Sequence, residues 1–223
     1  MQPGVPHHAI ALCRGSKKNT KMQRRRQIVR MIVTTIGHIS ELPKALETAI
    51  RMHAHGTTLD GRGEELPTVL VTLVGCPASG KSTVRAAITR LHMLGLICET
   101  ICPDDIRMRM TGDATDQSAN VAVWRYAIER LGTLLSMHGV MVIFDATASH
   151  VRDRRRLATE AHVHDAIAIE IWCDTPLEQC YERNDARERH VPRDVIRRMH
   201  SSISMNPPTG DQFADAVIVI RTH

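Results

Sequence analysis

The chain has 223 residues, of which 43% are hydrophobic and 24% charged, as expected for a water-soluble protein with one core. No apolar stretch approaches the roughly 20 residues that a membrane-spanning helix needs. The six cysteines form no Cys-x-x-Cys pair, so neither a disulfide framework nor a zinc site is expected, and we expect a reducing, cytoplasmic location.

The basic charge lies in the first third of the sequence. Residues 1–66 contain eleven Lys and Arg against five Asp and Glu, whereas residues 67–223 contain 18 against 19. The basic arm at residues 17–30 could bind nucleic acid, could be a transit peptide, or could be untranslated if Met22 or Met31 is the true start. We expect residues 1–66 to form a basic extension and linker, partly disordered or helical, and residues 67–223 to form the catalytic domain.

Predicted strands and helices alternate along the chain. A helical spacing of apolar residues covers 41–53, and residues 56–67 predict a linker. Short β-branched runs predict strands at 69–74, 96–101, 140–144, 166–172 and 216–220. Helices are predicted at 81–94, between the second and third strands up to about residue 138, and at 152–162, 176–183 and 192–203. The alternation predicts an α/β fold, a three-layer α/β/α sandwich around a parallel sheet of about five strands.

Residues 75–83 read Gly-Cys-Pro-Ala-Ser-Gly-Lys-Ser-Thr and match the P-loop pattern G-x-x-x-x-G-K-[ST] in full. The match lies between a predicted strand and a predicted helix, which is the context that the pattern requires. In such a loop, backbone N–H groups and the helix N-terminus face phosphate oxygens. Lys81 is predicted to bind the β- and γ-phosphates of ATP, and Ser82 to ligate Mg²⁺. The other predicted ATP-binding residues here are Gly75, Ala78, Ser79, Gly80 and Thr83.

Charged residues follow the second and third predicted strands, at the sheet edge where ligands bind in α/β folds. Asp104 and Arg107 could accept a hydroxyl proton and hold a substrate, as a kinase requires, or could be a helix cap and a solvated arginine. Asp145 could lie near Mg²⁺ or the transferring phosphate, or cap the next helix. Residues 183–192 are rich in arginine and predict a lid that closes on ATP, with a solvated loop as the alternative.

Together these motifs resemble the polynucleotide 5'-hydroxyl kinase family of small P-loop kinases. The resemblance covers about residues 68–220 and rests on four segments, namely the P-loop, D-D-I-R at 104–107, F-D-A-T at 144–147, and R-N-D-A-R at 183–187 followed by V-P-R-D-V-I-R-R-M. Two departures stand out: Pro103 precedes the Asp pair, where a polar or basic residue is usual, and the domain is nearly neutral.

The resemblance implies ATP and Mg²⁺ as cofactors and assigns roles to individual residues. Asp104 would be the general base for the 5'-hydroxyl, with Asp105 as the other candidate, and Arg107 would bind the nucleotide's phosphate. Arg187 would stabilise the transferring phosphoryl group. Asp145 matches the acidic residue at the third strand's end, and Arg183 matches the start of the lid, where it would flank the adenine.

The implied function is transfer of the γ-phosphate of ATP to a 5'-hydroxyl end of DNA or RNA, with Lys81, Asp104 and Arg187 as catalytic residues. A kinase of a small molecule or of a tRNA-linked group is the first alternative, because only six aromatic residues are available for base stacking. A non-enzymatic ATP-binding or RNA-binding protein is the second. The sequence contains no phosphatase or ligase motif, so a repair pathway would need separate partner proteins.

Overall fold

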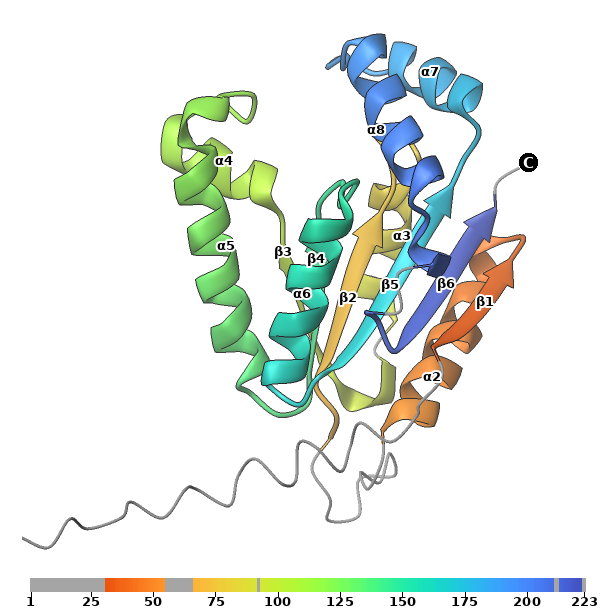
Figure 1. Ribbon diagram of the computed structural model, residues 1–223. Helices are drawn as coiled ribbons and strands as arrows, with labels where there is room; N and C mark the ends of the chain where they lie inside the picture. The colour runs from red at the N-terminus through yellow and green to blue at the C-terminus, as the bar shows by residue number, and fades with distance from the viewer. Residues whose placement is uncertain (1–30, 55–65, 92, 211–212, 222–223) are drawn as a thin grey trace, which may run out of the picture.

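The computed structural model describes residues 31–54, 66–91, 93–210 and 213–221. Its centre is one six-stranded sheet in which all neighbouring strands are parallel, in the order β1-β6-β5-β2-β4-β3 (Figure 1). The strands are β1 (Ile32–Ile36), β2 (Val69–Val74), β3 (Ile97–Ile101), β4 (Val140–Asp145), β5 (Ile167–Asp174) and β6 (Ala216–Arg221). All six residues of β2 are buried, as expected for an apolar strand covered on both faces.

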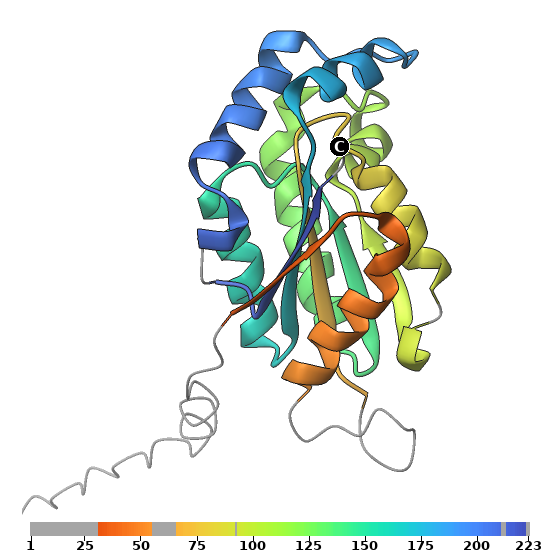
Figure 2. The ribbon, with the colours of Figure 1, turned by 90° about the vertical axis from the view of Figure 1, so that its right-hand side faces the viewer.

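Helices cover both faces of this sheet and confirm the predicted three-layer α/β/α sandwich. One face packs against α2 (Leu42–His53) and α3 (Lys81–Arg90), and the other against α5 (Asn120–Leu135) and α6 (Val151–Val163) (Figure 2). Three more helices, α4 (Pro103–Thr111), α7 (Leu177–Asp185) and α8 (Arg193–Met205), lie toward the end of the sheet at which the strands finish (Figure 1). Short 3₁₀ helices, η1 (Ile39–Glu41), η2 (Met93–Gly95), η3 (Gln117–Ala119) and η4 (Pro208–Gly210), join these elements.

The sheet has one strand more than predicted, and this strand lies in the segment that was assigned to the N-terminal extension. β1 pairs with β6 at the edge of the sheet. Only alternate residues of β1 are turned away from solvent: Ile32 and Thr34 are partly buried and Ile36 is buried. Such a short edge strand carries a weak apolar signal. The predicted helix at 41–53 is present as α2, and Leu42, Leu46 and Ile50 of α2 are completely buried in the core beside β5 and β6. Residues 32–53 therefore belong to the same core as the strands after residue 67.

Other boundaries moved by a few residues. The helix predicted at 81–94 ends at Arg90, where the Leu91 backbone leaves the helical region. The predicted basic arm and most of the predicted linker, at residues 1–30 and 55–65, lie outside the described residues. Within the described part of the chain, no helix combines the length and apolarity needed to cross a membrane.

Candidate active site

The loop between β2 and α3 has the tight bend that a P-loop needs. Ala78 (φ 66°) and Gly80 (φ 101°) adopt left-handed backbone conformations, which glycine adopts freely and alanine only at a cost. A Cβ at Gly75 would lie 2.3 Å from Ser79 Oγ and 3.3 Å from Cys173 Cβ. A larger residue at position 75 would therefore displace the loop.

Neighbouring strand ends fix the loop from both sides. The Thr175 hydroxyl, just after β5, donates a hydrogen bond to the Ser79 carbonyl (2.9 Å), and the Gly75 N–H donates to the Thr147 carbonyl (3.2 Å), just after β4. At the start of α3 the Thr83 and Val84 N–H groups donate to the Gly80 carbonyl, whereas the N–H groups of Lys81 and Ser82 come before the first hydrogen bond of the helix. The loop and the helix N-terminus thus form an anchored cradle of donors that is suited to phosphate oxygens.

Lys81 lies inside this cradle. Its ammonium group donates hydrogen bonds to the carbonyls of Gly75 (2.8 Å) and Cys76 (2.9 Å), and no carboxylate of the described residues forms an ion pair with it. Burial lowers the pKa of Lys81, and the positive charge of Arg187 acts in the same direction. The buried Ser79 hydroxyl also lacks a hydrogen-bond partner among the described residues. An incoming phosphate would compensate both groups, so the loop fits the predicted ATP.

The protein supplies few ligands for Mg²⁺. Ser82 is exposed in the first turn of α3, where its hydroxyl is available. In the described part of the chain, no three His, Cys, Asp or Glu side chains form a group that could hold a metal ion. Mg²⁺ at this site would therefore be held by Ser82, phosphate oxygens and water, which is a usual arrangement for this ion.

Asp145 ends β4 and accepts a hydrogen bond from the Arg85 guanidinium at 2.8 Å. Burial raises the pKa of Asp145, and Asp105 and Asp104 add to this rise against the opposing charges of Arg85 and Lys81. The carboxylates of α4 and β4 are therefore near enough to repel one another. Sequence reasoning missed Arg85, although its position four residues after Lys81, on the same face of α3, was a usable signal.

Asp104 and Arg107 are in direct contact. Arg107 Nη1 donates to Asp104 Oδ1 at 2.5 Å, and the same guanidinium donates to the Ala114 carbonyl (3.2 Å) and to Asn120 Oδ1 (3.1 Å). The Arg107 side chain is only 5% exposed, whereas that of Asp104 is 63% exposed. Asp104 thus faces solvent, and the buried guanidinium of Arg107 fixes its carboxylate by the hydrogen bond. The predicted contact between Arg107 and an acceptor phosphate stays a prediction.

The predicted lid connects α7 to α8. The side-chain amide of Asn184 donates to the Val191 carbonyl (3.0 Å), and its oxygen accepts from the Val191 N–H (2.9 Å), so one buried residue ties the base of the arginine-rich segment. Arg187 is exposed and lies close enough to Lys81 to affect its pKa. Arg183 reaches the P-loop, because its Nη1 would lie 3.8 Å from a Cβ at Gly80.

The relation to known proteins follows from a family model named AAA_33, an AAA domain, which matches residues 70–205. The chain belongs to the AAA_33 family. The adenylyl-sulfate kinase of Phocaeicola vulgatus is 30% identical over 121 residues, which cover 52% of this AAA_33 chain and 56% of that kinase. The bifunctional enzyme CysN/CysC of Mycobacterium tuberculosis (strain H37Rv) is 31% identical over 119 residues, 52% of this chain and 19% of that enzyme. The AAA_33 chain thus spans only about half the length of the adenylyl-sulfate kinase and about a fifth of the length of the bifunctional enzyme.

A solved structure shares the fold of this AAA_33 protein. It is titled the Pnkp1/Rnl/Hen1 RNA repair complex, and the superposition has a TM-score of 0.57 with 22% identity, covering 67% of this chain and 48% of the solved chain. At this identity the likeness concerns the fold. The AAA_33 chain has the P-loop kinase fold, in agreement with the resemblance to small P-loop kinases that its motifs indicated.

Proposed function

We propose that the protein is an ATP-dependent phosphotransferase that acts on a hydroxyl group. One observation carries the proposal: the P-loop lysine and a carboxylate cluster meet at the same edge of the sheet. The charge of Asp145 acts on Lys81, and the charges of Asp104 and Asp105 act on Asp145. The site thus combines a phosphate cradle with proton acceptors at one edge, as transfer to a hydroxyl requires.

Each group has a distinct task in this reaction. Asp104 accepts the proton of the acceptor hydroxyl, and the oxygen of this hydroxyl attacks the γ-phosphorus. The bond between the γ-phosphorus and the oxygen that bridges it to the β-phosphate breaks, and ADP leaves. Lys81 and the N–H groups of the P-loop neutralise the phosphates, and Arg187 approaches the transferring group from the lid. Mg²⁺ on Ser82 would supply further positive charge at the β- and γ-oxygens.

The 5'-hydroxyl end of DNA or RNA is the first acceptor to test. Its support is the order of four motifs along the chain, together with the fold shared with a protein of an RNA repair complex. Under this proposal, any phosphatase or ligase step would be carried out by separate partner proteins.

A small-molecule acceptor is the second candidate, and the charge near Asp104 favours it. Asp104, Asp105 and Asp113 are all exposed on α4 and the turn after it, whereas Arg107 is occupied by internal contacts. A polynucleotide binds through cationic contacts to its phosphates, and this surface offers mostly negative charge. The relative that is 30% identical is an adenylyl-sulfate kinase, which makes adenylyl sulfate a natural test compound.

The deciding experiment uses the full chain with Mg²⁺, γ-labelled ATP and a set of acceptors. The acceptors are 5'-hydroxyl DNA and RNA oligonucleotides, the same oligonucleotides with 5'-phosphates, and adenylyl sulfate; Lys81→Ala is the control variant. Label found only on 5'-hydroxyl ends, and lost in Lys81→Ala, supports the first candidate. Label on adenylyl sulfate alone supports the second. ATP binding without transfer to any of these compounds would contradict both the 5'-hydroxyl end and adenylyl sulfate as the acceptor.

A further inference from the structure

Two cysteines meet where the P-loop touches the lid helices. Cys76 is the second residue of the P-loop, and Cys180 lies in α7. Their sulfur atoms are 3.4 Å apart and in hydrogen-bond contact. Both thiols are free and buried. This contact joins positions that are 104 residues apart in the sequence.

The pair is the centre of a small apolar cluster that connects the lid to the loop. Cys76, Cys180 and Ile196 of α8 form its buried part, and partly buried apolar side chains from α7, α8 and the lid segment surround it. They are Leu177, Tyr181, Val191 and Met199. The helices α7 and α8 therefore pack against the P-loop through the side chain of Cys76.

The environments of the two thiols differ in a way that suits oxidation. The hydrogen bond with Cys180 lowers the pKa of Cys76 and the charge of Lys81 helps, although burial opposes both. The same contact, together with burial, raises the pKa of Cys180. One sulfur is thus the better nucleophile toward an oxidant, and the other stays protonated beside it as a resolving thiol.

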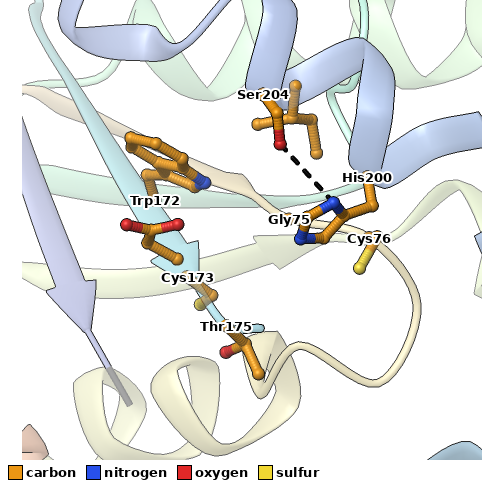
Figure 3. A pocket seen from close by; sticks show the side chains of 9 residues that line it. Gly75, Cys76, Trp172, Cys173, Thr175, His200 and Ser204 are labelled. Atoms are coloured by element: carbon orange, nitrogen blue, oxygen red, sulfur yellow. Dashed lines mark hydrogen bonds between the residues drawn. The ribbon is translucent and has the colours of Figure 1, made fainter. Parts of the chain in front are cut away.

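Cys76 also lines a small pocket between the P-loop, the end of β5 and α8. Gly75, Cys76, Trp172, Cys173, Thr175 and His200 are among its lining residues (Figure 3). A second thiol, Cys173, lies on the same wall, but burial raises its pKa to about 11. Cys76 is therefore the more reactive thiol that a small oxidant would reach through this pocket.

We propose that Cys76 and Cys180 form a reversible disulfide on exposure to a hydroperoxide, and that this bond locks the lid helix α7 to the P-loop. Cys76 gives up its thiol proton, and the thiolate attacks one oxygen of hydrogen peroxide, which gives a sulfenic acid and a hydroxide that takes up this proton as the first water. The Cys180 sulfur then attacks the Cys76 sulfur, and the leaving hydroxide takes the thiol proton as water. Two thiols are oxidised by one peroxide, two waters form, and a dithiol reductant reverses the reaction. The regulatory effect rests on the proposed function, whereas the disulfide itself does not.

The bond would disturb the site because the sulfurs must approach each other. A disulfide is about 2.05 Å long, so the present separation of 3.4 Å has to shrink by more than 1 Å. The carbonyl of Cys76 is also a hydrogen-bond acceptor of Lys81, so movement of this residue moves the catalytic lysine. Since a misplacement of about 1 Å can cost on the order of 10²-fold in rate, we expect phosphotransfer to fall by about two orders of magnitude.

The first part of the test maps the bond. The full chain is treated with hydrogen peroxide, alkylated and digested without reductant. Trypsin leaves Cys173 and Cys180 together in the peptide 157–183, and a further cut after Glu178 separates them. A linked pair of peptides that contain Cys76 and Cys180 is expected. Over-oxidised Cys76 without a link, or a link from Cys76 to Cys173, would overturn the proposal.

The second part measures the consequence in three proteins: wild type, Cys180→Ala, and Cys98→Ala as a matched control on the distant strand β3. Peroxide should reduce ATP binding or transfer in wild type and Cys98→Ala, and dithiothreitol should restore it. Cys180→Ala lacks the resolving thiol and should form no cross-link. Thermal melting checks that each variant is folded. If reduced wild type binds no ATP, the proposed function fails and the mapped disulfide stands alone. If the cross-linked protein binds ATP and transfers phosphate as well as the reduced protein does, the proposal that the disulfide inhibits the site is wrong.

Discussion

Arg107 shows how much one buried side chain organises the acceptor side of the site. Its guanidinium donates to Asp104 on its own helix, to the Ala114 carbonyl in the following loop and to Asn120 at the start of α5. A guanidinium suits this role because it presents several donors in a fixed plane. The position of Asp104 is therefore coupled to the packing of α4 against α5.

Replacement of Arg107 by alanine is expected to destabilise the fold. The change removes a buried guanidinium together with its hydrogen bonds to Asp104, Ala114 and Asn120, which costs about 1–3 kcal/mol. Urea unfolding of Arg107→Ala measures the loss, and Arg109→Ala, an exposed arginine on the same helix, is the matched control. An unfolding free energy equal to that of the control would show that these contacts contribute nothing.

A second residue-scale prediction concerns the general base. Asp104→Asn should lower the transfer rate by about 10²- to 10⁴-fold, because the carboxylate that accepts the proton is gone, while ATP affinity stays similar. Single-turnover rates and ATP titrations on the same protein separate the two effects. Asp105→Asn is the comparison, and a large loss in Asp105→Asn with a normal rate in Asp104→Asn would reverse the assignment.

At the scale of secondary-structure elements, Asn184 links the two lid helices. Both hydrogen bonds of its amide go to the backbone of Val191, so the six residues between them, 185–190, form a segment that is closed at its base. This segment carries Arg187, and the order that Asn184 imposes keeps this guanidinium close to Lys81. A lid that supplies charge to a transition state needs such positioning.

We expect Asn184→Ala to loosen the lid segment. Trypsin should cleave after Arg187 and Arg189 faster than in wild type, because local opening exposes the backbone, and transfer should slow. Arg198→Ala on the outer surface of α8 serves as the control for a harmless change nearby. Unchanged cleavage rates in Asn184→Ala would mean that the segment is held by other contacts.

Asp215 connects four elements at the opposite end of the sheet from the lid. Its carboxylate accepts hydrogen bonds from the Ala168 N–H at the start of β5 (2.8 Å) and from His162 of α6 (3.2 Å), and its carbonyl accepts from Ile32 of β1. Burial alone would raise the pKa of Asp215, but the hydrogen bonds from His162 and Ala168 outweigh it and lower the pKa below 3.8.

This lowered pKa predicts a specific pH dependence. The stabilisation by Asp215 is present in full above its ordinary pKa of 3.8 and is lost as the pH falls through the lower value of the folded state. Asp215→Asn should therefore lower the free energy of unfolding by about 1–3 kcal/mol near neutral pH, and the difference from wild type should shrink below pH 3.8. Asp174→Asn is the control, because the partly buried carboxylate of Asp174 at the end of β5 pairs only with the exposed Arg221 among the described residues. A difference that is independent of pH would contradict the prediction.

The sequence predicted the elements with strong local patterns and failed where a residue's role depends on distant neighbours. The P-loop and the inner strands were predictable, because a buried parallel strand is apolar throughout. β1 was missed because an edge strand buries only part of one face. Asn184 and Cys180 could not be assigned, since their partners Val191 and Cys76 become neighbours only in the folded chain. The spacing of Arg85 from Lys81 was a usable signal, but its contact with Asp145 also appears only in the fold.

At the scale of the whole molecule, residues 32–53 are part of the folded core. Leu42, Leu46 and Ile50 of α2 are completely buried, and each such side chain contributes about 1.5–3 kcal/mol by burial. Their sum is comparable to the total stability of a typical domain, about 5–15 kcal/mol. The family match at residues 70–205 thus leaves out both β1 and α2, and also β6.

Two truncations test this view of the core. Removal of residues 1–30 leaves every described strand and helix in place, so the unfolding midpoint should stay unchanged. Removal of residues 1–66 should strongly destabilise the protein or make it aggregate, because β6 becomes an open sheet edge beside a missing helix. Thermal melting and light scattering compare the two. A stable, monomeric chain without residues 1–66 would show that β1 and α2 are dispensable.

The pairing of β1 with β6 also has a consequence for folding during synthesis. β1 is the first described strand to leave the ribosome and β6 is the last. The backbone of β1 therefore cannot form its hydrogen bonds with β6 until the other described strands have been made. Such long-range pairing is slow to form, and the part of the apolar face of α2 that packs against β6 stays uncovered in the meantime. The nascent chain is therefore expected to be most prone to misassembly, and most dependent on chaperones, just before β6 emerges.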